Sequence, residues 1–377
     1  MRRVPPIRHF PLERFFPMNF RLLALFVCLW PLAASADDVP WLKDVLAPET
    51  AANVPVWKPL TPLLQDAAGT PIASLDAWKA RRDTLRSEWR TFLGPMPKRP
   101  ADLEIKSISK ETFDWGTREL VEYTGEPGLR ERAYILRPAG DATPGARAGI
   151  VALHPTTALT IDAIAGVQGE DRQHTGLKLA RAGFVVVCPM NFLWKDAKTL
   201  NAAVEKFQAR HPETKGMAKM LYDAERGVDL LLAQPDVDAK RVAAFGHSLG
   251  AKEVLYLLAF DDRVHAGVAS EGGIALDSTN WDAAWYLGPM AKDSKWSRNH
   301  HELLALIAPR PFLVIGGEQG PGAADGTRSL PYLRAAEPVY ALYGSPARLG
   351  LLNHGMGHPL TPDAFAKGIE WLRTYTE

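Results

Sequence analysis

Cysteine is nearly absent from this chain of 377 residues, which carries only Cys28 and Cys188. Cys28 lies in an N-terminal apolar run that we expect to be removed, so Cys188 would have no partner for an internal disulfide. Cys188 ends the apolar run 184–187, where a buried and inert thiol is expected. Disulfide cross-links within the mature chain are therefore excluded.

Excess charge of either sign is also lacking. The chain has 44 Lys and Arg residues against 43 Asp and Glu residues, a formal net charge of +1. No basic cluster follows the N-terminal segment, so nucleic acid and anionic membrane surfaces are not expected as partners. The sequence also shows no internal repeat and no low-complexity tract.

Long hydrophobic runs are limited to residues 22–32, which are too few for a comfortable membrane span. This run follows Met18-Asn19-Phe20-Arg21 and precedes Ala33-Ala34-Ser35-Ala36, the pattern of a signal peptide. We predict a signal peptide over 1–36, with Met18 as an alternative start of translation. The alternative is that this segment is retained as an anchor helix. The cleavage site has no lipobox cysteine, which favours a soluble product in the periplasm or outside the cell.

Residues 37–100 are interpreted as an N-terminal extension packed on the core. They are rich in proline up to Ser74 and then predict a helix over 75–93, with Gly94-Pro95 as its stop. From residue 101 to 377, antiparallel strand patterns come first and alternating strands and helices follow. This order predicts an α/β-hydrolase fold, with a mostly parallel central sheet and helices on both faces. The strands are expected at 103–109, 120–124, 132–136, 148–153, 184–188, 242–245, 264–269, 311–315 and 347–352, and the main helices at 214–233, 249–260 and 361–375.

The stretch 242–251, Val-Ala-Ala-Phe-Gly-His-Ser-Leu-Gly-Ala, has the pattern of a nucleophile elbow. A serine that attacks a carbonyl must stand clear of the backbone on a sharp turn. Gly246 and Gly250 remove the Cβ atoms that would collide where strand and helix cross. The pattern predicts Ser248 as a nucleophile. His247, inside the turn, is interpreted as a packing residue.

A serine nucleophile needs a base and an acid that orients the base. In this fold the base follows the last strand, where the segment 353–359 contains His354 and His358. We favour His358, which lies after Gly357 and before the closing helix, with His354 as the alternative. Glu271, Glu318 and Asp325 all follow strands at the same sheet edge, so the spacing leaves the acid open.

The oxyanion donors are expected from two places. One is the backbone N–H of Leu249 at the start of the elbow helix, where helix N–H groups lack intrahelical partners. The other is the loop 153–157, in which Thr156 or Thr157 can donate because Pro155 has no N–H. His154 in this loop is either a ligand contact or a buried histidine with satisfied hydrogen bonds.

An insertion over 274–301 carries several aromatic residues, among them Trp281 and Trp285. Loops at the catalytic edge usually set specificity, and these rings could stack on a sugar or an aryl acyl group. Packing in the core of a lid is the alternative. The adjacent His300 and His301 lack a pattern of acidic partners, so no metal site is predicted.

Six segments together resemble the bacterial α/β-hydrolases grouped with acetyl xylan esterases, dienelactone hydrolases and glucuronoyl esterases. The resemblance covers roughly 75–375. The segments are 89–95 (Trp-Arg-Thr-Phe-Leu-Gly-Pro), 153–157 (Leu-His-Pro-Thr-Thr), 246–250 (Gly-His-Ser-Leu-Gly), 270–273 (Ser-Glu-Gly-Gly), 301–311 ending Ala-Pro-Arg-Pro, and 357–358 (Gly-His).

The resemblance to glucuronoyl esterases implies a triad acid shortly after the strand that follows the elbow. Glu271 has this placement, 23 residues after Ser248, and is preferred to Asp325 on that ground. Glucuronoyl esterases carry an arginine directly after the nucleophile, where this chain has Leu249, which weakens the case for a uronate ester substrate. Dienelactone hydrolases proper use a cysteine nucleophile, so the serine here disfavours that activity.

The sequence thus predicts an exported serine esterase with a Ser248–His358–Glu271 triad and no cofactor or metal. Its substrate would be a small-molecule or polysaccharide ester, with plant cell-wall polysaccharide as a candidate. A peptidase of the same fold is one alternative. A non-catalytic carbohydrate-binding protein on a hydrolase scaffold is the other.

Overall fold

The computed structural model describes residues 1, 39, 41, 54–66, 68–140, 143–195, 197–293, 295–344 and 348–376. The chain divides into two compact units, Met1–Ala33 and Ala34–Glu377, and the second contains the sheet and its helices. The predicted signal peptide, apart from Met1, lies outside the described residues, while Cys188 is a buried free thiol as predicted. No helix among the described residues is long and apolar enough to cross a membrane.

The described residues form a nine-stranded sheet in the order β1-β2-β3-β5-β4-β6-β7-β8-β9. The pairs β1–β2, β2–β3 and β3–β5 are antiparallel, and all remaining pairs are parallel. The predicted fold class, a mostly parallel sheet with an antiparallel beginning, is therefore confirmed. The strands are β1 (Lys106–Phe113), β2 (Gly116–Thr124), β3 (Arg130–Pro138), β4 (Arg147–Leu153), β5 (Val185–Pro189), β6 (Val237–His247), β7 (Ala266–Ser270), β8 (Phe312–Gly316) and β9 (Leu349–Asn353).

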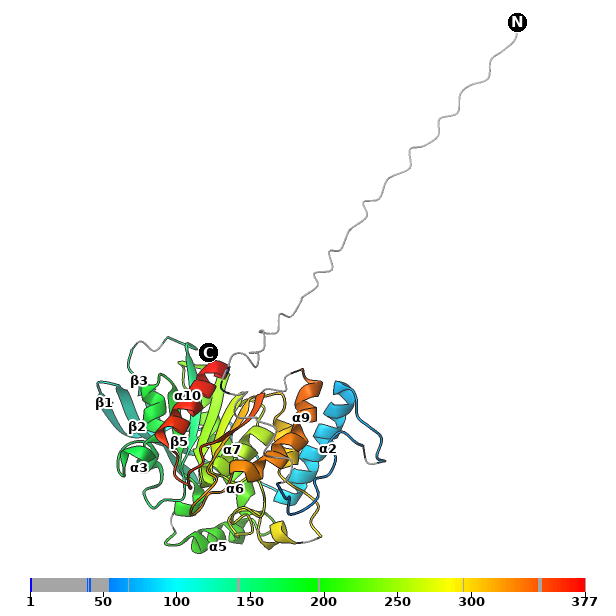
Figure 1. Cartoon of the computed structure of the whole chain (residues 1–377). Coiled ribbons are helices and arrows are strands. Elements are labelled where there is room, and N and C mark those ends of the chain that lie inside the picture. The colour runs from blue at the N-terminus through cyan, green and yellow to red at the C-terminus, as the bar shows by residue number, and fades with distance from the viewer. Residues whose placement is uncertain are drawn as a thin grey trace. The chain divides into compact units, whose positions relative to one another are not determined.

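Helices cover both faces of this sheet (Figure 1). The buried strands carry apolar residues on both faces, because successive side chains of a strand point to opposite sides. In β6, Ala244 joins the core beneath α6 and α7, while Phe245 joins the opposite core and meets Phe365 of α10 edge-on at 5.2 Å. The helices are α2 (Leu75–Leu93), α3 (Thr160–Ile164), α4 (Thr175–Arg181), α5 (Leu200–Arg210), α6 (Gly216–Leu232), α7 (Leu249–Phe260), α8 (His301–Ile307), α9 (Leu330–Leu342) and α10 (Pro362–Thr376), with short 3₁₀ turns at 171–173, 192–194, 289–292 and 326–329.

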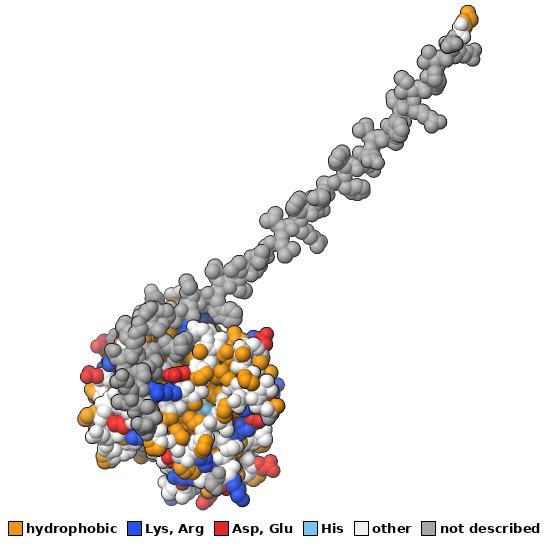
Figure 2. All heavy atoms as spheres, turned by 45° about the vertical axis from the view of Figure 1, so that its right-hand side comes forward, with side chains coloured by type: hydrophobic (Ala, Val, Ile, Leu, Met, Phe, Trp, Pro, Cys, Tyr) orange, Lys and Arg blue, Asp and Glu red, His pale blue; other side chains and the backbone are white. Residues whose placement is uncertain are grey.

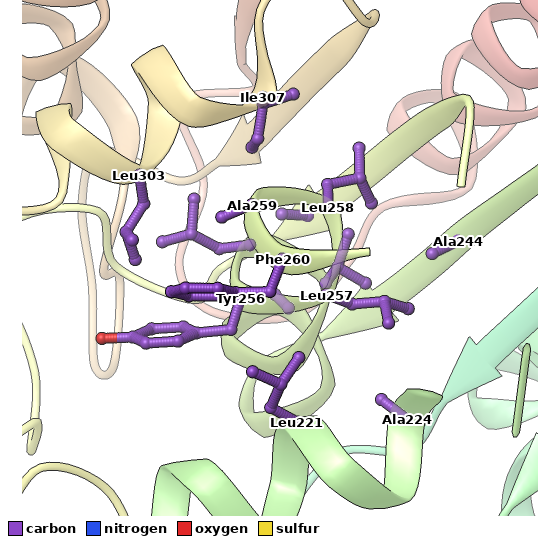
Figure 3. Close-up of a cluster of buried hydrophobic side chains, with 14 of the residues drawn as sticks. Leu221, Ala224, Ala244, Tyr256, Leu257, Leu258, Ala259, Phe260, Leu303 and Ile307 are labelled. Atoms are coloured by element: carbon purple, nitrogen blue, oxygen red, sulfur yellow. The ribbon is translucent and has the colours of Figure 1, made fainter. Parts of the chain in front are cut away.

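Helix α7 is the centre of one core, and each of its twelve residues is buried. Figure 3 shows its side chains meeting Leu221 and Ala224 of α6 on one side and Leu303 and Ile307 of α8 on another. A helix that is hydrophobic around most of its circumference belongs inside a protein rather than on its surface. This burial holds the first residue of α7, which follows the expected nucleophile, in a fixed position.

Helix α2 has the bounds that the sequence predicts. The Ser74 hydroxyl caps its start by accepting a hydrogen bond from the Ala77 N–H at 3.3 Å, and Gly94 follows its end with a positive φ of 89°. Trp89 is fully buried, and its Nε1–H donates to Glu302 of α8 at 2.7 Å. Helix α2 therefore packs against α8.

The edge strand β1 is offset from the predicted strand 103–109. Its residues are almost all exposed, so no alternation of buried and exposed positions fixes its register in the sequence. Leu103 still contacts the sheet, since its carbonyl accepts from the Thr124 N–H at 2.7 Å. The sequence patterns also did not predict α3, α4, α5, α8 or α9.

Charged side chains of both signs are interspersed with hydrophobic ones on the coloured part of the face in Figure 2. A surface with mixed charge gives no long-range preference for a polyanion.

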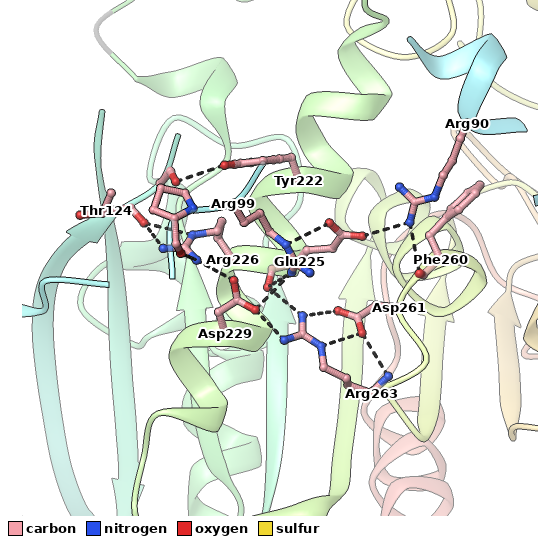
Figure 4. Close-up of polar contacts among 12 residues, drawn as sticks. Arg90, Arg99, Thr124, Tyr222, Glu225, Arg226, Asp229, Phe260, Asp261 and Arg263 are labelled. Carbon is pink, nitrogen blue, oxygen red and sulfur yellow. Dashed lines mark hydrogen bonds and ion pairs between the residues drawn. The ribbon is translucent and has the colours of Figure 1, made fainter. Parts of the chain in front are cut away.

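A partly buried ion-pair network connects α6 to its neighbours (Figure 4). Asp229 pairs with Arg226 and with Arg263, each at 2.6 Å, and accepts from Arg99 at 3.2 Å. Arg226 is only 1% exposed and also donates to the carbonyls of Thr124 and Pro100. The network therefore joins the antiparallel end of the sheet to the loop after α7.

Asp229→Ala should lower the free energy of unfolding by about 3 kcal/mol, because it leaves three arginines without their shared carboxylate. Urea unfolding followed by circular dichroism measures the change. Glu205→Ala on α5, at an exposed position, is the matched control and should change stability by less than about 0.5 kcal/mol. Equal stability of the two variants would contradict a stabilising role of the network.

Candidate active site

Ser248 lies on a strained turn between β6 and α7. Its φ of 58° and ψ of −115° place a non-glycine residue in the left-handed half of the map. Its N–H donates to the Ser270 carbonyl of β7 at 2.7 Å, which fixes the turn. The two glycines of the motif have a steric reason, since a Cβ at Gly246 would lie 2.2 Å from the Gly250 oxygen, and one at Gly250 would lie 2.1 Å from the Leu153 oxygen.

His358 lies on the loop between β9 and α10 and reaches Ser248. Its Nε2 is 3.0 Å from the Ser248 Oγ, and its Nδ1 is 2.7 Å from the carbonyl oxygen of Gly322. A carbonyl oxygen only accepts, so Nδ1 carries the proton and Nε2 offers its lone pair to the serine hydroxyl. This is the tautomer that a general base requires.

His354, the alternative base, does not contact Ser248. Its Nδ1 accepts from the Met356 N–H at 3.3 Å, and its Nε2 lies 3.4 Å from Glu271. The structure therefore brings His358, and not His354, to the serine.

Glu271 is buried beneath the histidine loop, at 1% exposure and with a positive φ of 57°. One carboxylate oxygen accepts from the Gly317 N–H, and the other accepts from the Ala324 N–H at 2.8 Å. These bonds hold the two ends of the segment 317–324, which carries Gly322. Glu271 thus acts on the loop that orients His358, and its own hydrogen bonds go to that loop rather than to the imidazole.

Burial, aided by the nearby charge of Asp325, raises the pKa of Glu271 to about 8, although hydrogen bonds from backbone N–H groups act in the opposite direction. Asp325 serves a different segment. Its oxygens accept from the N–H groups of Gly273 at 2.9 Å and Ile274 at 2.8 Å, and from the Ser329 hydroxyl at 2.6 Å. Asp325 therefore fixes the start of the insertion.

Glu271→Gln should lower kcat on the order of 10²-fold, because an amide cannot accept from both N–H groups, so the Gly322 loop and His358 would shift. Steady-state hydrolysis of phenyl acetate measures this. Asp325→Asn is the comparison and should affect stability more than kcat.

A loss near 10⁴-fold with Glu271→Gln would instead indicate that the carboxylate acts on the imidazole directly. A loss below about threefold would show that the Gly322 carbonyl needs no support from Glu271.

A cavity of about 190 Å³ opens beside the nucleophile. Thr156 and Thr157, two of the expected oxyanion residues, line it together with Ser248 and His358. Leu249 is the first residue of α7, where the N–H has no intrahelical acceptor. The complete lining is Pro155, Thr156, Thr157, Arg172, Gln173, Thr175, His247, Ser248, His358, Pro359 and Leu360.

His154 does not line this cavity and is fully buried. Its Nε2 accepts from the Asn191 N–H at 3.2 Å, so its Nδ1 donates to the Pro155 carbonyl at 2.9 Å. Burial lowers the pKa of His154 to about 4, which keeps the ring neutral. Its contacts fix the shape of the oxyanion loop, so the structure favours a satisfied buried histidine over a ligand contact.

Trp281 and Trp285 do not line the cavity either. Trp281 is 0% exposed, and its Nε1–H donates to the Gly273 carbonyl at 2.8 Å. Its ring packs against His300 at 4.4 Å and Tyr286 at 5.5 Å. Trp281 was proposed to stack on the substrate, with packing in the core of the insertion as the alternative, and the structure shows the packing, because the buried ring has no open face.

The insertion still reaches the oxyanion loop through Tyr286. The Tyr286 hydroxyl interacts with the Thr156 side chain, and burial raises the pKa of this phenol well above its ordinary value. Lys252 of α7 also ties the insertion down, since its Nζ donates to Gly272 and to Thr279 and lies 4.0 Å from the centre of the Trp281 ring. The insertion therefore contacts the oxyanion loop and α7 without lining the cavity.

Several residues line the cavity although the sequence did not predict them as site residues. His247 is a packing residue as the sequence predicts, since its Nδ1 lies 3.1 Å from the Ser270 Oγ. Its ring also lines the cavity, with its centre 5.0 Å from the centre of the His358 ring. Arg172, Gln173 and Thr175 come from the connection between β4 and β5, which has no recognised motif. Only its place after a strand that ends at the catalytic edge could have indicated a role.

The fold and the elbow together define the class of this protein as an α/β-hydrolase fold. The family model described as the dienelactone hydrolase family matches residues 151–289, a span that contains the elbow. No curated protein sequence matches the chain.

Solved structures of similar fold include several esterases. A glucuronoyl esterase from Solibacter usitatus has a TM-score of 0.69 at 18% identity, covering 86% of this chain and 100% of that chain. A glucuronoyl esterase from Teredinibacter turnerae has a TM-score of 0.64 at 22% identity, covering 90% of this chain and 99% of that chain. A candidate acetyl xylan esterase from Bacteroides fragilis has a TM-score of 0.59 at 14% identity, covering 78% and 83%. The likeness to these groups agrees with the resemblance seen in the sequence.

Proposed function

We propose that this protein is an exported serine esterase that hydrolyses carboxylic esters of small molecules or polysaccharides, in the periplasm or outside the cell. The observation that carries the proposal is the 3.0 Å contact between the Ser248 Oγ and the His358 Nε2 on a strained elbow. The similar fold of glucuronoyl esterases and of a candidate acetyl xylan esterase supports a carbohydrate ester as the substrate class.

In the proposed mechanism, His358 takes the proton of Ser248 through Nε2, and the serine oxygen attacks the ester carbonyl. The N–H of Leu249 and the N–H of Thr156 or Thr157 stabilise the oxyanion. The tetrahedral intermediate collapses to an acyl-enzyme as His358 donates the proton to the leaving alcohol. His358 then activates a water that releases the acid and restores Ser248.

Glu271 is proposed as the carboxylate that completes the site, with its effect relayed by the segment 317–324. Its two backbone hydrogen bonds place the Gly322 carbonyl, and this carbonyl holds Nδ1 of His358. The imidazolium formed during the reaction would favour the ionised state of this buried carboxyl group.

The test is reaction of the purified protein with a fluorophosphonate probe, read by mass spectrometry of tryptic peptides. Labelling at Ser248, together with turnover of phenyl acetate, is the expected result. An unlabelled protein that also fails to hydrolyse simple aryl esters would overturn the proposal and favour a non-catalytic scaffold.

The acid limb of the pH dependence of kcat/KM should lie below pH 6.5. Burial lowers the pKa of His358 from its ordinary value, against the opposing effect of the Gly322 carbonyl. His358 must be neutral to act as a base, so a lowered pKa preserves activity into more acidic solution.

The profile is measured with phenyl acetate, and samples are returned to pH 7 to exclude unfolding. A limb above pH 6.5 would contradict this expectation, because it would require a negative charge that acts on the imidazole more strongly than burial does.

A further inference from the structure

The only formally charged side chain that lines the cavity beside Ser248, among the residues described, belongs to Arg172. The two histidines of the lining are neutral near pH 7, because burial lowers the pKa of His247 to about 3 and also lowers that of His358. Among the residues that the structure describes, no aspartate or glutamate lines this cavity. The one formal charge at the cavity wall is therefore positive, although Arg172 also pairs with Glu170 outside the lining.

The guanidinium of Arg172 is only partly used. Its Nε–H donates to the Glu170 carboxylate at 2.6 Å, and within the described part of the chain no other hydrogen bond of this side chain is found. The four N–H groups on the two Nη atoms form a planar fork that matches a carboxylate. The side chain is 60% exposed, so a ligand can reach this fork.

The short turn 171–173 holds Arg172 in place at the cavity wall. The Glu170 and Gln173 side chains form a reciprocal capping box around this turn, and the Glu170 N–H donates to the Gln173 Oε1 at 2.9 Å. Asp171 is paired with Lys178 at 2.7 Å, so the acidic neighbour on the turn is occupied by another cation. Local contacts therefore fix the backbone of Arg172, and no described residue occupies its Nη groups.

We propose that Arg172 is the specificity-determining residue of this site and that its Nη groups bind a carboxylate carried by the ester substrate. The inference rests on the proposed esterase function and adds the substrate class, an anionic ester. The cavity of about 190 Å³ is smaller than typical small-molecule sites, so it holds the reacting end of the ester while the carboxylate meets Arg172 at the mouth.

The carboxylate can belong to the acid or to the alcohol half of the ester, and paired substrates distinguish the two. Phenyl hydrogen adipate and phenyl hexanoate differ by a charge on the acid half. 3-Carboxyphenyl acetate and phenyl acetate differ by a charge on the alcohol half. The measured quantity is the ratio of kcat/KM for the anionic and the neutral member of each pair.

The wild-type protein should favour the anionic ester in one pair, and Arg172→Ala should lower that ratio by about fivefold, mainly through KM, because the interaction is with an exposed cation. Arg172→Lys should restore part of the preference, since it keeps the charge and loses the fork. Salt at 0.5 M should weaken the wild-type preference. Arg181→Ala, an exposed arginine of α4 that does not line the cavity, is the matched control and should leave both ratios unchanged.

A wild-type protein that hydrolyses neutral esters without preference for either anionic partner would overturn this inference and leave the esterase function standing. An equal loss on neutral and anionic esters with Arg172→Ala would also overturn it, because Arg172 would then only stabilise the turn. Absence of hydrolysis of all four esters by the wild-type protein would instead overturn the proposed function itself.

Discussion

Replacing Ser248 by alanine should abolish ester hydrolysis, with kcat reduced on the order of 10⁴- to 10⁶-fold. The substitution removes the only atom placed to attack the carbonyl, and His358 would then face a methyl group. Residual hydrolysis would come from the oxyanion donors and from a water activated by His358. The measurement is the steady-state hydrolysis of phenyl acetate at concentrations well above the KM of the wild-type protein.

Ser87→Ala on the exposed face of α2 is the control for this result, and it should leave kcat unchanged. The Ser248→Ala protein should also unfold at nearly the wild-type temperature, because the backbone of the elbow is unchanged. A slightly higher temperature is also consistent, because the lost hydroxyl serves function and not stability. Full activity of Ser248→Ala would contradict the nucleophile assignment and with it the proposed mechanism.

Replacing Gly250 by alanine should destabilise the protein by more than about 4 kcal/mol. The added Cβ would lie 2.1 Å from the Leu153 carbonyl oxygen and 2.6 Å from its carbon, which are backbone atoms of β4. Neither the strand nor the buried α7 can move aside cheaply, because both are packed on several sides. Urea unfolding of the purified variant measures the effect, and insoluble expression at 37 °C is the extreme form of the same result.

Gly368→Ala on α10 is the matched glycine control. A Cβ there would meet Ile315 at 3.4 Å and Val268 at 3.5 Å, which is ordinary contact, and alanine is the better helix former by roughly 0.5–1 kcal/mol. This variant should be as stable as the wild-type protein or more stable. If Gly250→Ala behaved like Gly368→Ala, the close approach of α7 to β4 would not be the reason for the second glycine of the motif.

This chain has a fold similar to that of several carbohydrate esterases, and the sequence identities of 14% to 22% support a likeness of fold alone. Residues of this site that depart from the pattern of glucuronoyl esterases therefore bear on its substrate. The residue after the nucleophile is Leu249, which is 1% exposed and packs into the core, so its side chain offers nothing to an oxyanion. A positive charge reaches the cavity instead from Arg172, on a connection far from the elbow in the sequence.

Much of the fold could be predicted because its signals are local. The bounds of α2 and α7 follow from a capping serine, a glycine stop and the strand–turn–helix pattern. The buried strands β4 and β5 read as short apolar runs because both of their faces are covered. Edge strand β1 lacked such a signal, since an exposed strand has no buried side to set its register.

The sequence by itself determined the fold class, Ser248 as the candidate nucleophile and the segment that supplies the base, since an elbow motif and a histidine after the last strand are local features with fixed places in this fold. The choice of His358 over His354 came from the tertiary structure. The tertiary structure decided the rest. Whether a carboxylate, a tryptophan or an arginine meets the site depends on where loops from separate strands return, and spacing along the chain does not encode this. Hence Glu271 bonds to a loop, Trp281 fills a core and Arg172 lines the cavity.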